Sequence, residues 1–171
     1  MYKPLKKEIV SVLVLNQANV LTRVVSLFGR RGFNIDSLTV SATNDPALSR
    51  ITIVFSATEQ SMQQIITQTE KLEVVKSIYI LNRENSLYRE LLLLKVNATP
   101  EELSTIKDIV DVYRGKIVDL STDSMIIELT GTPEKIDGFM DVIKDYDISE
   151  VCRTGITGIE SKVVKNKNDY L

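Results

Sequence analysis

The period of the apolar residues switches along the chain between the two-residue repeat of a strand and the longer repeat of a helix. The same order of switches occurs twice. The first occurrence predicts strand, helix, two strands, helix and strand, over 9–15, 20–31, 34–42, 50–55, 59–72 and 74–81. The second predicts a strand over 91–96, a helix from 99 that stops at Gly115, strands over 116–120 and 125–130, a helix from 132 and a strand over 148–159. We therefore expect an α+β fold of two ferredoxin-like βαββαβ modules in tandem.

The two modules set the expected domain boundaries. The first domain is expected over residues 8–82 and the second over 88–162, with the polar segment 82–86 as the linker and 163–171 as a polar tail. A ferredoxin-like module carries both helices on one face of its antiparallel sheet. The other face needs a cover, so we expect the chain to pair with a partner.

Local signals add detail to the second module. Thr99, Pro100 and Glu102 have the spacing of a helix N-terminus with a capping box. The run Leu91–Val96 is too apolar for a half-exposed strand, which predicts a central strand. Gly155 interrupts the last strand, and glycine inside a strand favours a bulge or the close approach of another backbone. We therefore expect an interface at Arg153, Thr154 and Gly155.

The residues that are missing exclude most enzyme chemistry. The chain has 171 residues, no histidine and one cysteine, Cys152. These counts exclude the usual zinc ligand sets and any Ser-His or Cys-His nucleophile pair. Catalysis by carboxylates or lysine stays possible without the most used general base, but we expect no catalytic residue and no metal ligand. Next to Val151, Cys152 is expected to be a small core residue. The acidic pairs Glu101–Glu102 and Asp145/Asp147 are expected to mark helix ends.

Charge and hydropathy limit the classes of partner that the chain is expected to bind. The formal net charge is −2, which does not favour nucleic acid as a partner. No apolar run approaches the roughly 18 residues of a membrane span, and the charged N-terminal segment lacks the apolar stretch of a signal peptide. We expect a cytoplasmic protein with neither a nucleic-acid nor a membrane partner.

The turn that follows the first strand is the main candidate site. The first amides of a helix lack internal partners, and the helix dipole favours a carboxylate or phosphate there. Asn16 and Asn19 add side-chain amides that donate and accept, which suits an amino acid. Asn34 is expected nearby. The alternative is structural, with Asn19 capping the helix and Asn16 ending the strand.

A second candidate is an anion patch formed by Arg30, Arg31 and Arg50. The structural alternative is a solvated basic face at a helix C-terminus, where positive charge suits the dipole. This alternative is the favoured reading of the three arginines.

Short motifs spread over nearly the whole chain resemble one family. In the first half they are Ser11-Val12-Leu13, Asn16, Val20-Leu21-Thr22-Arg23-Val24, Leu27-Phe28, Arg31-Gly32-Phe33-Asn34-Ile35, Ser37-Leu38-Thr39-Val40 and Leu48-Ser49-Arg50. In the second half they are Arg89-Glu90-Leu91, Lys95-Val96, Tyr113-Arg114-Gly115, Gly131 and Arg153-Thr154-Gly155-Ile156. The first half resembles an ACT domain, an amino-acid-sensing module. The whole resembles the regulatory small subunits of acetolactate synthase, also called acetohydroxyacid synthase (AHAS).

The resemblance implies a function. Small subunits of this family pair side by side through their ACT domains and bind valine or a related branched-chain amino acid at the interface. They activate a thiamine-diphosphate-dependent catalytic large subunit, make it sensitive to feedback inhibition, and perform no chemistry. The chain itself would hold no cofactor; thiamine diphosphate, Mg and FAD are expected in the catalytic partner. The implied effector site contains Asn16, Asn19, Val20 and Leu21 of one chain with Asn34 and Ile35 of its neighbour.

One position departs from the family pattern. The family usually has glycine where this chain has Asn19. Asparagine tolerates the left-handed backbone conformation but adds a side chain. We therefore hypothesise that the chain activates its partner and senses valine weakly.

Two other readings stay open. A stand-alone ACT-type sensor of another enzyme or of a transcription factor would share only the first module. An enzyme on a ferredoxin-like scaffold would need a nucleophile or base that the sequence does not supply.

Overall fold

The structure, a computed structural model, describes residues 5–161. The expected polar tail, 163–171, lies outside the described residues. The chain divides into two compact units. The first contains the residues up to Leu87 together with those from Ile156 onward, and the second contains Tyr88–Gly155. None of the helices in the described part of the chain is long and apolar enough to cross a membrane.

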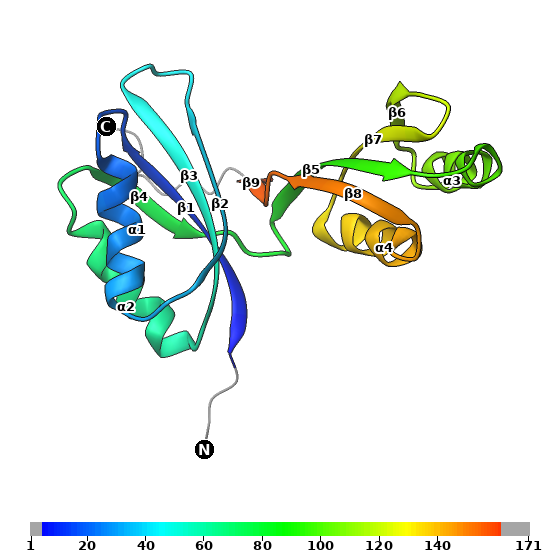
Figure 1. Cartoon of the computed structure of the whole chain (residues 1–171). Helices are drawn as coiled ribbons and strands as arrows, with labels where there is room; N and C mark the ends of the chain where they lie inside the picture. The colour runs from blue at the N-terminus through cyan, green and yellow to red at the C-terminus, as the bar shows by residue number, and fades with distance from the viewer. Residues whose placement is uncertain (1–4, 162–171) are drawn as a thin grey trace. The chain divides into compact units, whose positions relative to one another are not determined.

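The first unit is a four-stranded antiparallel sheet with two helices on one face (Figure 1). Its sheet order is β2-β3-β1-β4. The elements are β1 (Lys6–Leu15), α1 (Val20–Arg30), β2 (Ile35–Ala42), β3 (Leu48–Ala57), α2 (Glu59–Glu70) and β4 (Val75–Ile80). This order confirms the first predicted βαββαβ module, with every boundary within three residues of its predicted position.

Strand alternation builds the core of the first unit. Val12 of β1 pairs with Ile51 of β3, and alternate residues on both strands point to the same face. The helices cover that face. Phe28 of α1 packs edge-to-face against Phe55 of β3, with ring centroids 5.1 Å apart. The fully buried aliphatic residues of these two strands on the helix face are Val10, Val12, Val14, Ile51, Ile53 and Ala57.

The second unit repeats the arrangement. Its sheet order is β6-β7-β5-β8, and a short strand β9 also pairs with β5. The elements are β5 (Ser86–Asn97), α3 (Pro100–Val112), β6 (Lys116–Leu120), β7 (Ser124–Gly131), α4 (Pro133–Ile143) and β8 (Asp147–Arg153). The strand β9 (Thr157–Glu160) follows Ile156 and is counted with the first compact unit. The predicted capping box is confirmed: the Thr99 side chain accepts from the Glu102 amide, and the Glu102 carboxylate accepts from the Thr99 amide. The tandem ferredoxin-like fold is therefore confirmed.

β5 is the central strand that its composition predicted, but it starts at Ser86, so the predicted linker is one residue shorter. The expectation that this strand is not half-exposed is wrong. Leu92, Leu94 and Val96 are fully buried, whereas Leu93 between them is 39% exposed. Leu93 lies on the sheet face that the helices do not cover. The uninterrupted apolar run Leu91–Val96 gave no sign that one face of this strand is open.

Cys152 corrects a second expectation, because it is exposed. It pairs with Leu93 across β5 and β8, and directly paired residues share a face. Cys152 therefore lies on the open face of the second sheet, and the expected place in the core is wrong. The apolar neighbour Val151 pairs instead with the buried Leu94, yet it is itself exposed because β8 is an edge strand.

The end of the chain returns to the first unit. Gly155 has a φ of +79°, a conformation that glycine adopts freely, and it breaks the predicted last strand into β8 and β9. Beyond the break, Ile156 is only 4% exposed, and its carbonyl accepts a hydrogen bond from the Thr39 hydroxyl of β2. The second compact unit ends at Gly155, and the predicted domain boundary at 162 stays a prediction.

Candidate functional site

The turn between β1 and α1 is built around a left-handed residue. Asn19, the residue before the helix, has φ 65° and ψ 4°. Its side chain makes no capping hydrogen bond, although its carbonyl accepts the first helical bond from the Arg23 amide. The structural alternative, in which the Asn19 side chain caps the helix, is therefore wrong.

This turn leaves backbone donors free. In α2, α3 and α4 a threonine side chain accepts a hydrogen bond from the first-turn amide three residues on. α1 has no such cap and no acidic residue in its first turn. Within the described residues, the amides of Leu21 and Thr22 have no acceptor. The positive end of α1 is open to an anion.

Asn16 holds the neighbouring loop in place. Its side-chain Nδ2 donates to the Pro46 carbonyl at 2.9 Å, and its backbone amide donates to the Ala47 carbonyl at 2.7 Å. The β2–β3 turn is thereby fixed beside the β1–α1 turn. The Asn16 side-chain oxygen receives no hydrogen bond from the described residues, so it can still accept one from an ammonium group.

The side chains of Val20 and Leu21 differ in their exposure to solvent. The Val20 side chain is 4% exposed and belongs to the core, so only its backbone can face a ligand. The Leu21 side chain is 38% exposed. It offers an apolar surface at the start of α1.

Asn34 and Ile35 lie at the other end of the sheet. Ile35 of β2 pairs with Phe55 of β3, which pairs with Glu8 of β1. Asn16 directly follows β1 and is eight residues after Glu8, so the separation along the strand is about 26 Å at roughly 3.3 Å per residue. The expectation that Asn34 lies near the turn is therefore wrong within one chain. Its side chain donates to Asp36 instead.

The three arginines do not form one patch. Arg30 and Arg31 lie at the end of α1, whereas Arg50 is on the sheet face away from the helices. There Arg50 Nη1 donates to the Ser11 hydroxyl at 2.7 Å and to the Tyr79 hydroxyl at 2.9 Å. The sequence did not predict this arrangement, since it depends on the register of three strands.

Arg153 makes contacts inside the second unit. Its guanidinium donates to the carboxylates of Glu90 and Asp137, and Glu90 is only 5% exposed. Burial alone would lower the pKa of Arg153, but the hydrogen bonds to Glu90 and Asp137 and their charges raise it above its usual value. In the described chain this residue serves the packing of β5, β8 and α4, and the predicted interface at 153–155 remains untested.

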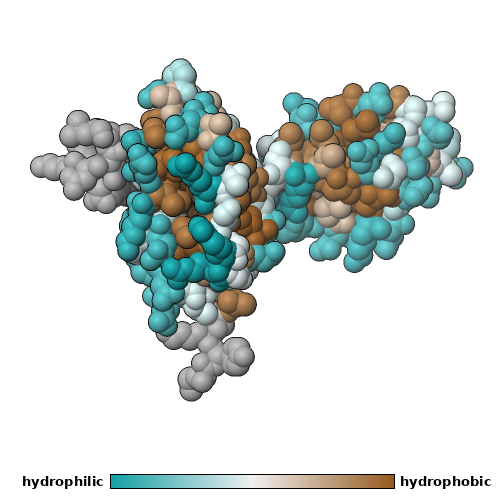
Figure 2. All heavy atoms as spheres, turned by 60° about the vertical axis from the view of Figure 1, so that its left-hand side comes forward, coloured by the Kyte–Doolittle hydropathy of each residue, from teal (hydrophilic) through white to brown (hydrophobic). Residues whose placement is uncertain are grey.

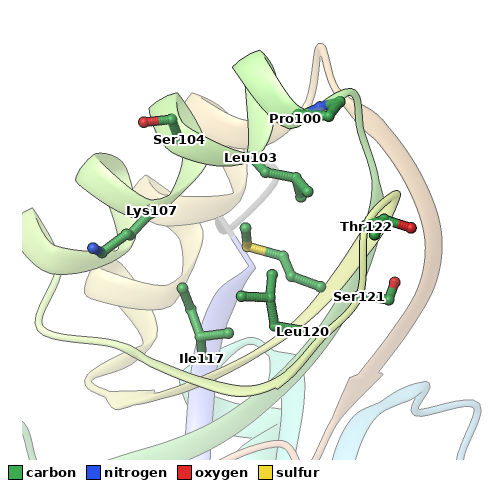
Figure 3. Close-up of a pocket in the computed structure, with 9 residues that line it drawn as sticks. Pro100, Leu103, Ser104, Lys107, Ile117, Leu120, Ser121 and Thr122 are labelled. Atoms are coloured by element: carbon green, nitrogen blue, oxygen red, sulfur yellow. The ribbon is translucent and has the colours of Figure 1, made fainter.

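An apolar groove of about 350 Å³ lies in the second unit between α3 and the β6–β7 hairpin (Figure 3). Leu103, Ile117 and Leu120 point into it. Hydrophobic residues also reach the surface of this unit (Figure 2), and Leu120 is 62% exposed. Sequence reasoning missed the groove, although the apolar residues of the hairpin were a signal for it.

Tandem ferredoxin-like modules, the first with a turn of free amides and asparagines before α1, define the class of ACT-domain regulatory proteins. Residues 10–77 match the family model of the AHAS small subunit-like ACT domain. Residues 89–162 match the model described as the small subunit of acetolactate synthase. The chain belongs to the acetolactate synthase small subunit family, whose members are non-catalytic subunits.

Individual relatives agree along nearly the full length. A probable acetolactate synthase small subunit of Archaeoglobus fulgidus is 45% identical over 150 residues, which cover 87% of this chain and 93% of the relative. The acetolactate synthase small subunit of Mycolicibacterium smegmatis is 44% identical over 149 residues, covering 87% and 88%. The crystal structure of the Thermotoga maritima small subunit superposes with a TM-score of 0.85 at 36% identity, covering 91% of this chain and 97% of that one.

Proposed function

We propose that this chain activates an acetolactate synthase catalytic subunit and transmits feedback inhibition by valine or a related branched-chain amino acid. The observation that carries the effector role is the turn before α1, where free amides and the Asn16 oxygen lie together at the positive end of a helix. An amino acid presents one carboxylate for the amides and one ammonium for an amide oxygen.

The site needs two chains. β2 is an edge strand, and an antiparallel pairing of β2 with β2 of a second copy places the start of one strand beside the end of the other. Asn34 and Ile35 precede and begin β2, so they would meet the neighbour's Asn16 end of the sheet. A site shared between two chains thus accounts for the separation of about 26 Å between Asn16 and Asn34 within one chain. Val40 of β2 is 46% exposed and would be covered by the same pairing.

The catalytic chemistry belongs to the partner. We assign thiamine diphosphate, Mg and FAD to the catalytic subunit. The role of this chain is to bind the effector and to alter its contact with the catalytic subunit in response. By linkage, an effector that alters the contact with the catalytic subunit has its own affinity altered by that contact. We propose a cytoplasmic location for both subunits.

The alternative is a stand-alone ACT-type sensor that regulates another enzyme or a transcription factor. It explains the first unit equally well. It gives no reason for the match of residues 89–162 to the small-subunit model.

The test is acetolactate formation by the cognate catalytic subunit, with and without this chain, across a valine titration. We expect the chain to raise the rate and valine to lower it, and Asn19→Gly to lower the valine concentration required. A matched control is Asn82→Ala, because Asn82 is an exposed asparagine outside the turn. If the chain leaves the rate unchanged, the stand-alone sensor takes first place.

Mixing two variants tests whether the site is shared. Asn16→Ala and Asn34→Ala should each abolish valine binding in calorimetry. In a random mixture of the two, the mixed dimers contain one intact site each, which restores about a quarter of all sites. A site contained in one chain would restore none.

A further inference from the structure

The open face of the first sheet has an unusual composition near its β1–α1 end. Strand register places Ser41, Arg50, Leu13 and Ser77 in one row across the four strands. The next row consists of Thr39, Thr52, Ser11 and Tyr79. A single cation therefore lies among hydroxyl side chains. Part of this face is covered: Thr39 contacts Ile156, and Ser11 and Thr52 are buried. The row at the β1–α1 end is more accessible, with Ser41 exposed and Arg50 half-buried.

Arg50 is held in one orientation. One of its nitrogens, Nη1, donates to both Ser11 and Tyr79, and the guanidinium carbon lies 5.8 Å from the centre of the Tyr79 ring. These contacts fix the planar group against the sheet. Its other two nitrogens, Nε and Nη2, have no acceptor among the described residues. A fixed fork of donors is suited to a carboxylate.

This cation also has no counter-ion among the described residues of the first unit. No carboxylate lies within ion-pair distance of Arg50 in the described part of the chain. None of the paired residues whose side chains lie on this face is Asp or Glu. A half-buried arginine without a carboxylate is an incomplete ion pair, since partial burial favours pairing.

We propose that the Arg50 face is a docking surface for the catalytic subunit, which supplies a carboxylate to Arg50 and polar groups to the accessible hydroxyls beside it, above all Ser41. This inference rests on the proposed function and names the surface through which it acts. A second copy cannot be the occupant through a symmetric contact, because two Arg50 faces would meet with no carboxylate between them. Nucleic acid is disfavoured by the single cation and the net charge of −2.

The test compares two substitutions that remove the same charge. Arg50→Gln removes the proposed contact, and Arg30→Gln removes an exposed arginine at the end of α1, on the helix side of the unit. Binding of the full-length chain to the purified catalytic subunit is measured by calorimetry at low and high salt. We expect Arg50→Gln to weaken binding about tenfold or more and to flatten its salt dependence, while Arg30→Gln matches the wild type.

A second variant covers the case in which Arg50→Gln does not fold. Ser41→Asp keeps the bonds of Arg50 and places a carboxylate directly opposite it on the neighbouring strand. Because Ser41 is exposed, the sheet should form, and the new carboxylate should compete with the partner and weaken binding. Sedimentation of the variant alone checks that its own assembly is unchanged.

The outcomes separate the two proposals. If the wild-type chain neither binds the catalytic subunit nor raises its rate, the proposed function fails. If the wild type binds and folded Arg50→Gln and Ser41→Asp bind equally well, the docking surface is wrong and the function stands. Equal weakening by Arg30→Gln would also overturn the docking surface, because it would indicate an effect of net charge alone.

Discussion

At the scale of single residues, backbone conformation decides how the turn before α1 can work. Asn19 and Arg114 are the non-glycine residues with positive φ in the described chain. Asparagine accepts this conformation more readily than most residues, yet glycine pays no steric penalty there. The glycine that is usual in the family and the asparagine in this chain thus satisfy one backbone requirement and differ in the side chain they present to a ligand.

Replacing Asn19 by glycine should therefore stabilise the fold. We expect Asn19→Gly to raise the free energy of unfolding by about 0.5–1 kcal/mol, because the strain of the left-handed residue is relieved. Ala18→Gly is the matched control. The φ of Ala18 is not positive, so glycine relieves no strain there and the added entropy of the unfolded chain should lower stability. Urea denaturation of both variants measures the difference, and a destabilised Asn19→Gly would contradict the argument.

At the scale of helices and strands, the N-termini of the helices differ in whether a side chain caps them. α3 is closed by the box between Thr99 and Glu102, whereas α1 leaves its first amides free. Hydrogen bonds from the Thr99 backbone and side chain lower the pKa of Glu102 below its usual value of 4.5. A carboxyl with a lowered pKa in the folded state stabilises the fold above its unfolded pKa and loses that effect as pH falls through the folded value.

The box should consequently show a defined pH dependence. The stability lost in Glu102→Gln should be present at pH 7 and should shrink as pH falls below 4.5, where the wild-type carboxylate becomes protonated. Glu101→Gln is the control, since Glu101 lies in the same first turn and makes no box contact. Chemical denaturation at a series of pH values measures both. A loss that is constant with pH would show that the box does not depend on the charge.

For the whole molecule, the first unit depends on residues from both ends of the sequence. Ile156 is buried in it, although the intervening 88–155 forms the second unit. Replacing Ile156 by alanine should lower the free energy of unfolding by about 2–4 kcal/mol through lost burial and an unfilled space. Ile159→Ala, at a residue that is 65% exposed, should change it by less than about 0.5 kcal/mol. Thermal unfolding compares them, and equal effects would argue against the return segment.

Assembly is the second property of the whole molecule. If β2 pairs with a second copy, Val40→Lys places a charge in that contact, and the dimer should dissociate at concentrations where the wild type does not. Val142→Lys is the control, since Val142 of α4 is 47% exposed and lies in the second unit. Analytical ultracentrifugation measures both. If only Val142→Lys dissociated the dimer, the contact between the two copies would not be at β2.

The sequence by itself determined the local structure. Apolar periodicity located the helices and strands, since burial on one face repeats every two residues in a strand and every 3.6 in a helix. The spacing of Thr99 and Glu102 identified a cap, because that contact spans only three residues. Gly155 marked the break between β8 and β9, because a positive φ favours glycine. The family resemblance pointed to Asn16 and Asn19.

Only the tertiary structure decided what depends on contacts between distant residues. Strand register separates Asn34 from Asn16 in one chain and joins Arg50 to Ser11 and Tyr79. The open face of the second sheet exposes Cys152, and Ile156 returns to the first compact unit. Periodicity specifies which face of an element is apolar, but not which distant strand or segment lies beside it. That choice is made by packing and pairing between residues far apart in the sequence.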